Sequence, residues 1–475
     1  MYSDSLFALS HNWEVVPLGE ACQRGGGNVQ TGPFGSQLHA SDYVSEGIPS
    51  VMPQNIGDNR IVYTGIARVS TEDAKRLSKY RIQEGDIVYS RRGDVERRAL
   101  VRSAEDGWLC GTGCLRIRFG QGVVYPKYAA HYLGHAAVRQ WIVRHAHGAT
   151  MPNLNTTILS QLPFVVPPWK DQVSIGDALD AYDQKIATNR HVSQTLEALA
   201  QAIFKSWFVD FDPVKAKISA VSEGRDPLRA AMSAISGKAG AELDALPREQ
   251  FDRLSLTAAQ FPDETEETEM GDIPKGWRIR SIPDCIEVNP FRSLRKGVVA
   301  PYLDMANVPT NSPRVQNVIL REFSSGSKFQ NGDTLLARIT PCLENGKTAY
   351  VDFLSDGEVG WGSTEFIVLR PKKGLPQPFA YFLCRDPEFR AFAISQMAGT
   401  SGRQRVPNDC FGSYKLVEPP PAVAIEFKRI SCAVMDQIKA LDEETKALAT
   451  LRDTLLPKLL SGELLVAAAT ARAEA

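Results

Sequence analysis

The sequence lacks long apolar runs, an excess of charge and clustered cysteines. No apolar run reaches the 18 residues that a membrane-spanning helix needs. The 54 Lys and Arg residues balance 55 Asp and Glu residues, so a nucleic-acid binder of this composition requires local basic patches. The N-terminus lacks the charged-then-apolar pattern of a signal peptide. The eight cysteines are scattered, with only Cys110 and Cys114 close together. We therefore expect a cytoplasmic protein with reduced thiols.

Complete catalytic motifs are also missing. Gly346-Lys347-Thr348 resembles the end of a phosphate-binding loop, but Pro341 stands where that loop needs its first glycine. Asn289-Pro290-Phe291 resembles the Asn-Pro-Pro-aromatic motif of adenine methyltransferases, but one proline is absent and no glycine-rich methyl-donor loop accompanies it. We expect no catalytic residue and no cofactor in this chain.

Metal ligands are suggested only by four histidines between residues 131 and 147. A helix predicted over Pro126–His147 would put His131 and His135 on one face, where they could hold a metal ion. Cys110 and Cys114 have no second pair at zinc-site spacing. We interpret the histidines as part of a structural surface helix and expect no metal site.

What the sequence does contain is a repeat. Trp13–Phe208 is echoed by Trp277–Leu460, and Gln83–Arg91 reappears as Gln330–Arg338. His147-Gly148-Ala149-Thr150 and Pro152-Asn153 reappear as Ala398-Gly399-Thr400-Ser401 and Pro407-Asn408. A repeat of this size predicts two similar modules and a pseudo-twofold molecule, which suits a target that also has two halves.

The predicted fold class is α+β, with two mixed α/β modules separated by two long antiparallel helices. Alternating β-formers between glycine-rich turns predict strands, and one further helix is expected in each module, over Pro126–His147 and Gln377–Met397. The expected boundaries are module 1 at 1–168, helix 1 at 169–213, a polar linker at 214–272, module 2 at 273–421, helix 2 at 422–464 and a flexible tail at 465–475.

The two long helices, Ser174–Phe208 and about Val423–Leu460, carry apolar stripes in the same phase. Stripes of this length are buried in stable proteins, and the simplest partner of each helix is the other one. We predict an antiparallel rod of about 50 Å with a module at each end; the alternative is that each helix packs on its own module. The predicted interface comprises Ile175, Leu179, Tyr182, Ile186, Leu196, Ile203, Trp207, Phe427, Val434, Ile438, Leu448, Leu451, Leu455 and Leu459.

Polar loops occur at matched positions of the two modules with different side chains. Arg suits guanine edges and phosphates, whereas Asn and Gln suit adenine edges. Ordinary solvated loops are the alternative, but recurrence in both modules favours recognition. The candidate DNA-binding residues are Ser36, Arg91, Arg92, Arg97, Arg98, Thr150, Asn153 and Asn155 in module 1, and Arg338, Thr340, Asn345, Lys347, Ser401, Arg403, Gln404, Arg405 and Asn408 in module 2.

Over nearly its whole length the chain resembles the DNA specificity subunits of type I restriction-modification systems. The resemblance rests on the two Gly-Asp strands, on Arg338–Lys347, on His147–Asn155, and on the stretches Phe204–Val214 and Leu455–Leu464. It implies two target-recognition domains that each read one half of a bipartite, asymmetric DNA site. It also implies that the helices set the gap and dock two modification subunits, which bind S-adenosylmethionine and methylate adenine. A motor-nuclease subunit would join for ATP-dependent cleavage, with Mg²⁺ also expected on the partners.

We therefore expect a non-catalytic, sequence-specific DNA-binding subunit that acts in host defence. Three alternatives remain open at this point. The chain could serve a type IIB-like system, in which one partner carries both cleavage and methylation. It could be a stand-alone DNA methyltransferase with a divergent cofactor site, or a coiled-coil adaptor that binds no DNA.

Overall fold

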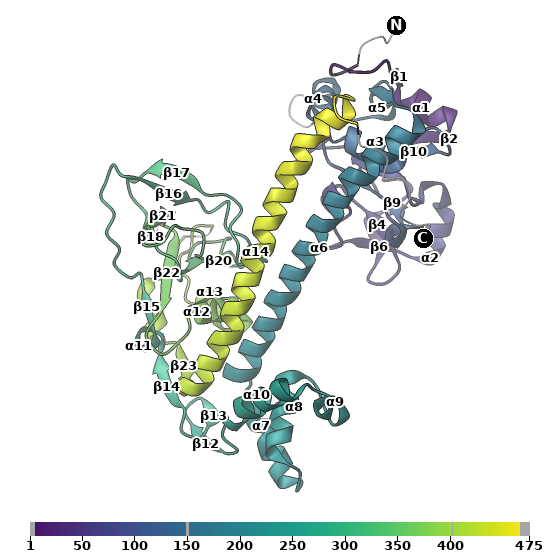
Figure 1. Cartoon of the computed structure of the whole chain (residues 1–475). Coiled ribbons are helices and arrows are strands. Elements are labelled where there is room, and N and C mark those ends of the chain that lie inside the picture. The colour runs from purple at the N-terminus through teal and green to yellow at the C-terminus, as the bar shows by residue number, and fades with distance from the viewer. Residues whose placement is uncertain (1–4, 149–151, 401, 466–475) are drawn as a thin grey trace. The chain divides into compact units, whose positions relative to one another are not determined.

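The computed structural model describes residues 5–148, 152–400 and 402–465. The chain divides into two compact units, one of Met1–Ala187 with Lys446–Ala475 and one of Thr188–Thr445. The division falls inside both long helices. Each unit therefore contains one module together with part of each helix (Figure 1).

Module 1 contains two sheets and a separate strand pair. Its strands are Glu14–Pro17 (β1), Gly26–Thr31 (β2), Tyr43–Val44 (β3), Ile48–Val51 (β4), Asp58–Asn59 (β5), Ala67–Val69 (β6), Ile87–Ser90 (β7), Arg98–Leu100 (β8), Leu109–Cys110 (β9), Cys114–Gly120 (β10) and Pro163–Val166 (β11). The sheets have the orders β2-β10-β7-β8-β5 and β3-β6-β4-β9, and β1 pairs antiparallel with β11. The short helices are Leu18–Arg24 (α1), Thr71–Arg76 (α2), Pro126–Tyr132 (α3), Ala136–His145 (α4) and Thr156–Ser160 (α5).

Module 2 repeats this plan. Its strands are Arg278–Ser281 (β14), Ile286–Val288 (β15), Val299–Leu303 (β16), Ile319–Glu322 (β17), Ser327–Phe329 (β18), Thr334–Ala337 (β19), Thr348–Tyr350 (β20), Gly360–Gly362 (β21), Phe366–Pro371 (β22) and Lys415–Glu418 (β23). The orders are β15-β22-β19-β20 and β17-β16-β21-β18, with β14 paired to β23. The helices are Ile282–Cys285 (α11), Pro378–Arg385 (α12) and Pro387–Ser395 (α13). The expectation of two similar mixed α/β modules is therefore confirmed.

The repeated Gly-Asp pair has the same structural role in both modules. Gly85 and Gly332 both adopt φ +88°, a left-handed conformation that favours glycine. The carboxylate of Asp86 accepts from Gln83 N at 2.8 Å, and that of Asp333 accepts from Gln330 N at 2.7 Å. Each buried aspartate also pairs with an arginine of the neighbouring strand, Arg118 or Arg370. The motif therefore fixes the turn that leads into β7 or β19.

Each single helix predicted within the modules is in fact two helices. The helix expected over Pro126–His147 is interrupted between α3 and α4, where the His135 ring nitrogen accepts from Ala137 N and caps α4. The helix expected over Gln377–Met397 is interrupted at Asp386, whose carboxylate accepts from two backbone amides of α13. The prediction was wrong because a new N-cap competes successfully with a continuous helix when a side chain satisfies the free amides.

The long helices are Trp169–Phe208 (α6) and Pro421–Leu460 (α14), each of 40 residues and so about 60 Å long (Figure 1). In the first unit, Ile175 and Leu179 share a hydrophobic core with Leu459 and Leu460. In the second unit, Phe204 and Phe208 pack against Phe427, with ring centroids 5.9 and 4.9 Å apart. The start of one helix thus packs beside the end of the other, which makes the pair antiparallel as expected.

The predicted interface residues differ in burial. Most of them are buried or packed against a buried core. Tyr182, Leu196 and Leu448 are only partly buried, and Leu451 is 50% exposed, so its expected place in the interface was wrong. Leu199, which lies 252 residues before Leu451, is also exposed, at 56%. The apolar stripe is therefore wider than the contact between the two helices.

The expected polar linker is largely folded. It contains the helices Asp212–Ser222 (α7), Pro227–Ser236 (α8), Ala241–Asp244 (α9) and Arg248–Ala259 (α10), and the hairpin of Thr265–Thr268 (β12) and Gly271–Pro274 (β13). Met232, Leu243 and Ala258 form a small core among these helices. Of the helices within the described ranges, none is both long and apolar enough to traverse a membrane.

Candidate nucleic-acid interface

In module 1 two loops are joined through their main chains at the end of β7. Leu154 N donates to Arg91 O at 2.8 Å, and Gly93 N donates to Pro152 O at 3.1 Å. His147 and Asn153 exchange two further backbone hydrogen bonds, at 3.1 and 2.7 Å. The loop that carries the arginines is therefore fixed to the loop that carries the asparagines.

The same pattern occurs in module 2. Val406 N donates to Arg338 O at 2.9 Å, Thr340 N donates to Gln404 O at 3.1 Å, and Ala398 and Arg405 exchange two hydrogen bonds. We call this shared set of backbone bonds the main-chain clasp. It makes Asn153 structurally equivalent to Arg405, which corrects the expected match of Pro152-Asn153 with Pro407-Asn408.

The clasp presents some of the candidate residues of module 1 and not others. Arg92 and Arg97 are exposed, and Arg97 pairs with Asp94 at 2.9 Å. Arg98 is 8% exposed and donates to Ala130 O at 2.7 Å, so it holds the fold rather than a recognition surface. The Asn155 side chain accepts from Ile158 N at 2.8 Å as the N-cap of α5. Ser36 is exposed in a turn, and Thr150 lies outside the described residues.

The candidates of module 2 also separate into presented and internal groups. Arg403, Asn345 and Asn408 are exposed, and Gln404 is partly buried. Arg405 pairs with Glu365 at 2.7 Å. Lys347 donates to Met305 O at 2.6 Å, and the Thr340 hydroxyl is buried, so both face the interior. Ser401 lies outside the described residues.

Arg91 and Arg338 are equivalent in the repeat and share an electrostatic feature. Both are partly buried, and both follow the Gly-Asp strand at its carboxyl end. Within the described residues, the buried Nε atom of each lacks a hydrogen-bond partner. A buried donor left unsatisfied costs free energy, so an acceptor that reached either Nε atom would stabilise the guanidinium.

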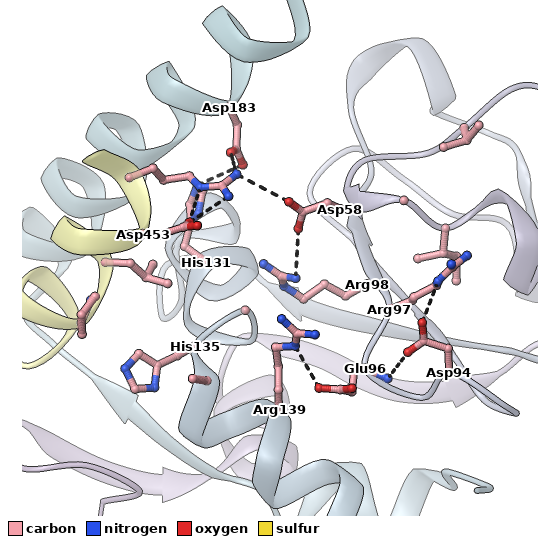
Figure 2. A pocket seen from close by; sticks show the side chains of 18 of the residues that line it. Asp58, Asp94, Glu96, Arg97, Arg98, His131, His135, Arg139, Asp183 and Asp453 are labelled. Atoms are coloured by element: carbon pink, nitrogen blue, oxygen red, sulfur yellow. Dashed lines mark hydrogen bonds and ion pairs between the residues drawn. The ribbon is translucent and has the colours of Figure 1, made fainter. Parts of the chain in front are cut away.

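A large cavity of about 680 Å³ lies in the first unit between module 1 and the long helices. Figure 2 shows its charged lining, in which Asp58 lies 3.8 Å from Arg98. Arg452 lies 2.6 Å from Asp183 and 3.6 Å from Asp58. Acidic and basic side chains alternate around the cavity and satisfy one another. This arrangement anchors the module to the helices and does not create an anion-binding surface.

His131 lies at the base of this charged cluster. It is 3% exposed, and its Nε2 atom is 3.9 Å from Asp183. Burial lowers its pKa from 6.5 to about 4, so the ring is neutral at pH 7. His135 caps α4 instead of sharing a face with His131, and the described residues contain no group of three or more potential metal ligands.

The second unit contains a corresponding anchor made of other residues. Tyr381 donates from its hydroxyl to Glu197 on α6, and Arg385 lies 3.3 Å from the same carboxylate. Arg314 pairs with Asp352 and, at 3.3 Å, with Asp442 on α14. The sequence analysis missed the anchors of both units. A charged residue on a helix is usually solvated, and no local sequence feature distinguishes the anchoring residues from other charged residues.

Comparison with known proteins agrees with this architecture. Residues 11–198 match the family described as type I restriction modification DNA specificity domain. The chain is 27% identical to the HindI specificity subunit of Haemophilus influenzae, over 88% of this chain and 95% of that protein. It is 20% identical to the MjaIX specificity subunit of Methanocaldococcus jannaschii, over 96% and 95%.

A solved structure shares the fold. The type I restriction-modification S subunit from M. genitalium aligns with a TM-score of 0.51 at 13% identity, covering 95% of this chain and 96% of that one. The two modules and the long helices agree with the resemblance read from the sequence. Residues 11–198 therefore match the DNA specificity domain of type I restriction-modification systems, and over most of its length the chain is similar to the specificity subunits of such systems.

Proposed function

We propose that this chain reads a bipartite, asymmetric DNA site, with one half-site assigned to each module. The main-chain clasp is the observation that carries the proposal. It gives both modules one scaffold and lets each carry different side chains, for example Asn153 in module 1 and Arg405 in module 2. Two half-sites of different sequence require two modules that share a backbone scaffold but present different side chains to the bases.

Arg91, Arg92, Arg338 and Arg403 are the cations best suited to contact DNA. The first three follow the Gly-Asp strand, and Arg403 lies in the clasped loop of module 2. In this proposal they supply phosphate and guanine contacts, while Gln404, Asn345 and Asn408 contribute amide contacts to bases. Because the net charge of the chain is −1, affinity depends on these local groups and falls as salt rises.

The long helices set the distance between half-sites and dock two modification subunits. Leu199 on α6 and Leu451 on α14 are related by the repeat and are both about half exposed, which suits two like partners. Restriction and translocation subunits complete the assembly, in which this chain is non-catalytic and cytoplasmic. S-adenosylmethionine, ATP and Mg²⁺ belong to the partners.

The test is base-modification sequencing of DNA from cells that carry this chain with its partner subunits. The expected result is a two-part methyladenine motif that disappears when the gene for this chain is deleted. Substitutions of side chains in the clasped loops of module 2 alone should change one half of the methylated motif and leave the other half unchanged. A single undivided motif, or labelled methyl transfer by the purified chain alone, would contradict the proposal.

A further inference from the structure

Phe291 is held with its ring in solvent. It is 88% exposed, the highest exposure among the large apolar side chains of the described residues. Asn289 before it adopts φ +52° and exchanges hydrogen bonds with Val368 on β22, at 2.7 and 2.9 Å. Arg292 after it lies 3.1 Å from the buried Asp333. The backbone on both sides is therefore fixed, which leaves the ring exposed on a rigid support.

A groove of about 310 Å³ opens beside this ring. Arg338, Lys328 and Asn408 line it together with Phe291, and Arg338 contributes the buried Nε atom that lacks a partner. Of the described residues that line the groove, none carries a carboxylate. The charged cavity of the first unit differs, since five carboxylates neutralise its cations. The groove of module 2 therefore favours an anionic, aromatic ligand.

Module 1 carries the same combination. Phe34 is 52% exposed, and the Arg91 guanidinium lies over its ring at 5.7 Å. Phe34 is the third residue after β2 and follows Pro33, just as Phe291 is the third residue after β15 and follows Pro290. Arg91 and Arg338 are equivalent through the clasp. An exposed phenylalanine thus accompanies the same arginine in both modules.

We propose that Phe291 with Arg338, and Phe34 with Arg91, are base-stacking contacts to DNA, one in each module. The inference rests on the proposed DNA-reading function and deepens it. In a duplex a base face becomes available only where the stack is opened, so each ring inserts at such an opened step and stacks on one nucleobase. The adjacent guanidinium binds the neighbouring phosphate or base edge. Such stacking tolerates any base, because every base has an aromatic face. The two rings therefore add affinity and set register without themselves specifying sequence.

The test uses the full chain assembled with its modification subunits and a duplex that carries the methylated motif. Phe291→Ala should weaken binding by about 10-fold, the order measured when a stacked aromatic residue is lost. Phe291→Tyr, which keeps the ring, should bind like the wild type. 2-Aminopurine placed at successive positions of the half-site should show one position whose fluorescence changes on binding, and that change should disappear with Phe291→Ala. Phe34→Ala should behave in the same way in the other half-site.

The salt dependence separates the two members of each pair. Phe291→Ala should leave the slope of log affinity against log salt unchanged, whereas Arg338→Ala should reduce it by about one. Leu256→Ala, which alters a 68% exposed side chain on α10, is the matched control and should bind normally. Equal thermal midpoints for the phenylalanine variants would show that folding is intact.

Wild-type affinity of both alanine variants would overturn the stacking proposal while leaving DNA reading in place. A variant that assembles poorly with modification subunits, yet binds DNA normally once assembled, would assign the ring to a protein contact instead. If the wild-type complex itself fails to select its motif, the proposed function and this inference fail together.

Discussion

The Arg452 guanidinium on α14 donates to Asp183 on α6 at 2.6 Å, and Asp183 also accepts from Asn59 of module 1 at 2.9 Å. Burial alone would raise the pKa of Asp183, but His131, Asn59 and Arg452 together lower it below its usual value. One carboxylate thus joins both long helices to the module within the first unit.

Arg452→Met should destabilise the first unit by about 3 kcal/mol, because the largely buried Asp183 would keep its charge and lose its partner. The double variant Arg452→Met with Asp183→Asn should lose less than the two single variants added together. Urea unfolding followed by circular dichroism measures the effect. Strictly additive losses would show that the two residues do not interact in solution.

His131 should make the first unit sensitive to mild acid. Its pKa falls from 6.5 to about 4 through burial, so between these values the unfolded chain binds a proton that the folded chain excludes. Stability from this group is complete above pH 6.5 and is lost as the pH falls towards 4, by up to about 3 kcal/mol at 1.36 kcal/mol per unit. The thermal midpoint of His131→Gln should therefore fall less than that of the wild type between pH 7.5 and 5. If the thermal midpoints of the two proteins fell by the same amount, the His131 ring would not be neutral and buried.

Asn155 should matter for stability and not for DNA sequence. Its side chain caps α5, so Asn155→Ala should cost about 1 kcal/mol and Asn155→Asp should cost little. In modification sequencing, complexes that carry either variant should still methylate the wild-type motif. Arg92→Ala, by comparison, should leave stability unchanged and weaken DNA binding. If Asn155→Asp changed one half-site of the motif, Asn155 would contact DNA after all.

Leu199→Lys and Leu451→Lys should each remove one copy of the modification subunit from the assembly. A charged side chain at an apolar contact leaves an unpaired ion that must be desolvated. Native mass spectrometry counts the bound copies. Leu256→Lys, at a 68% exposed position on α10, is the control and should retain both copies. Full occupancy in both helix variants would exclude these leucines from docking.

Insertion of one heptad into both long helices should lengthen the gap in the DNA motif and leave its halves unchanged. Seven residues add about 10 Å at 1.5 Å per residue, which is about three base pairs at 3.4 Å each. Modification sequencing gives the gap directly. Altered half-sites with a constant gap would contradict the role of the helices as a spacer.

Features that depend on repetition or periodicity along the chain could be predicted from the sequence. The Gly-Asp strands, the duplicated modules and the paired helices all follow from spacing along the chain. The hydrogen-bond partners of individual side chains could not be predicted, because they depend on the folded structure. From the sequence Asn155 was expected to contact a base, whereas its side chain caps α5. Arg98 reads as part of an exposed basic cluster, whereas the fold buries it against Ala130. The phase of the apolar stripe predicted Leu451 as buried, because periodicity does not say how wide the contact between two helices is.

The main-chain clasp has a consequence for inheritance. Its bonds join peptide groups, so the frame itself does not depend on the side chains of Asn153 and Arg405. If these loops contact bases, as proposed, their substitution changes the DNA site that the protein selects and leaves the frame in place. On the same proposal, a lineage could acquire a new target by a few codon changes, or by exchanging one module, and keep a chain that still assembles with the same partner subunits.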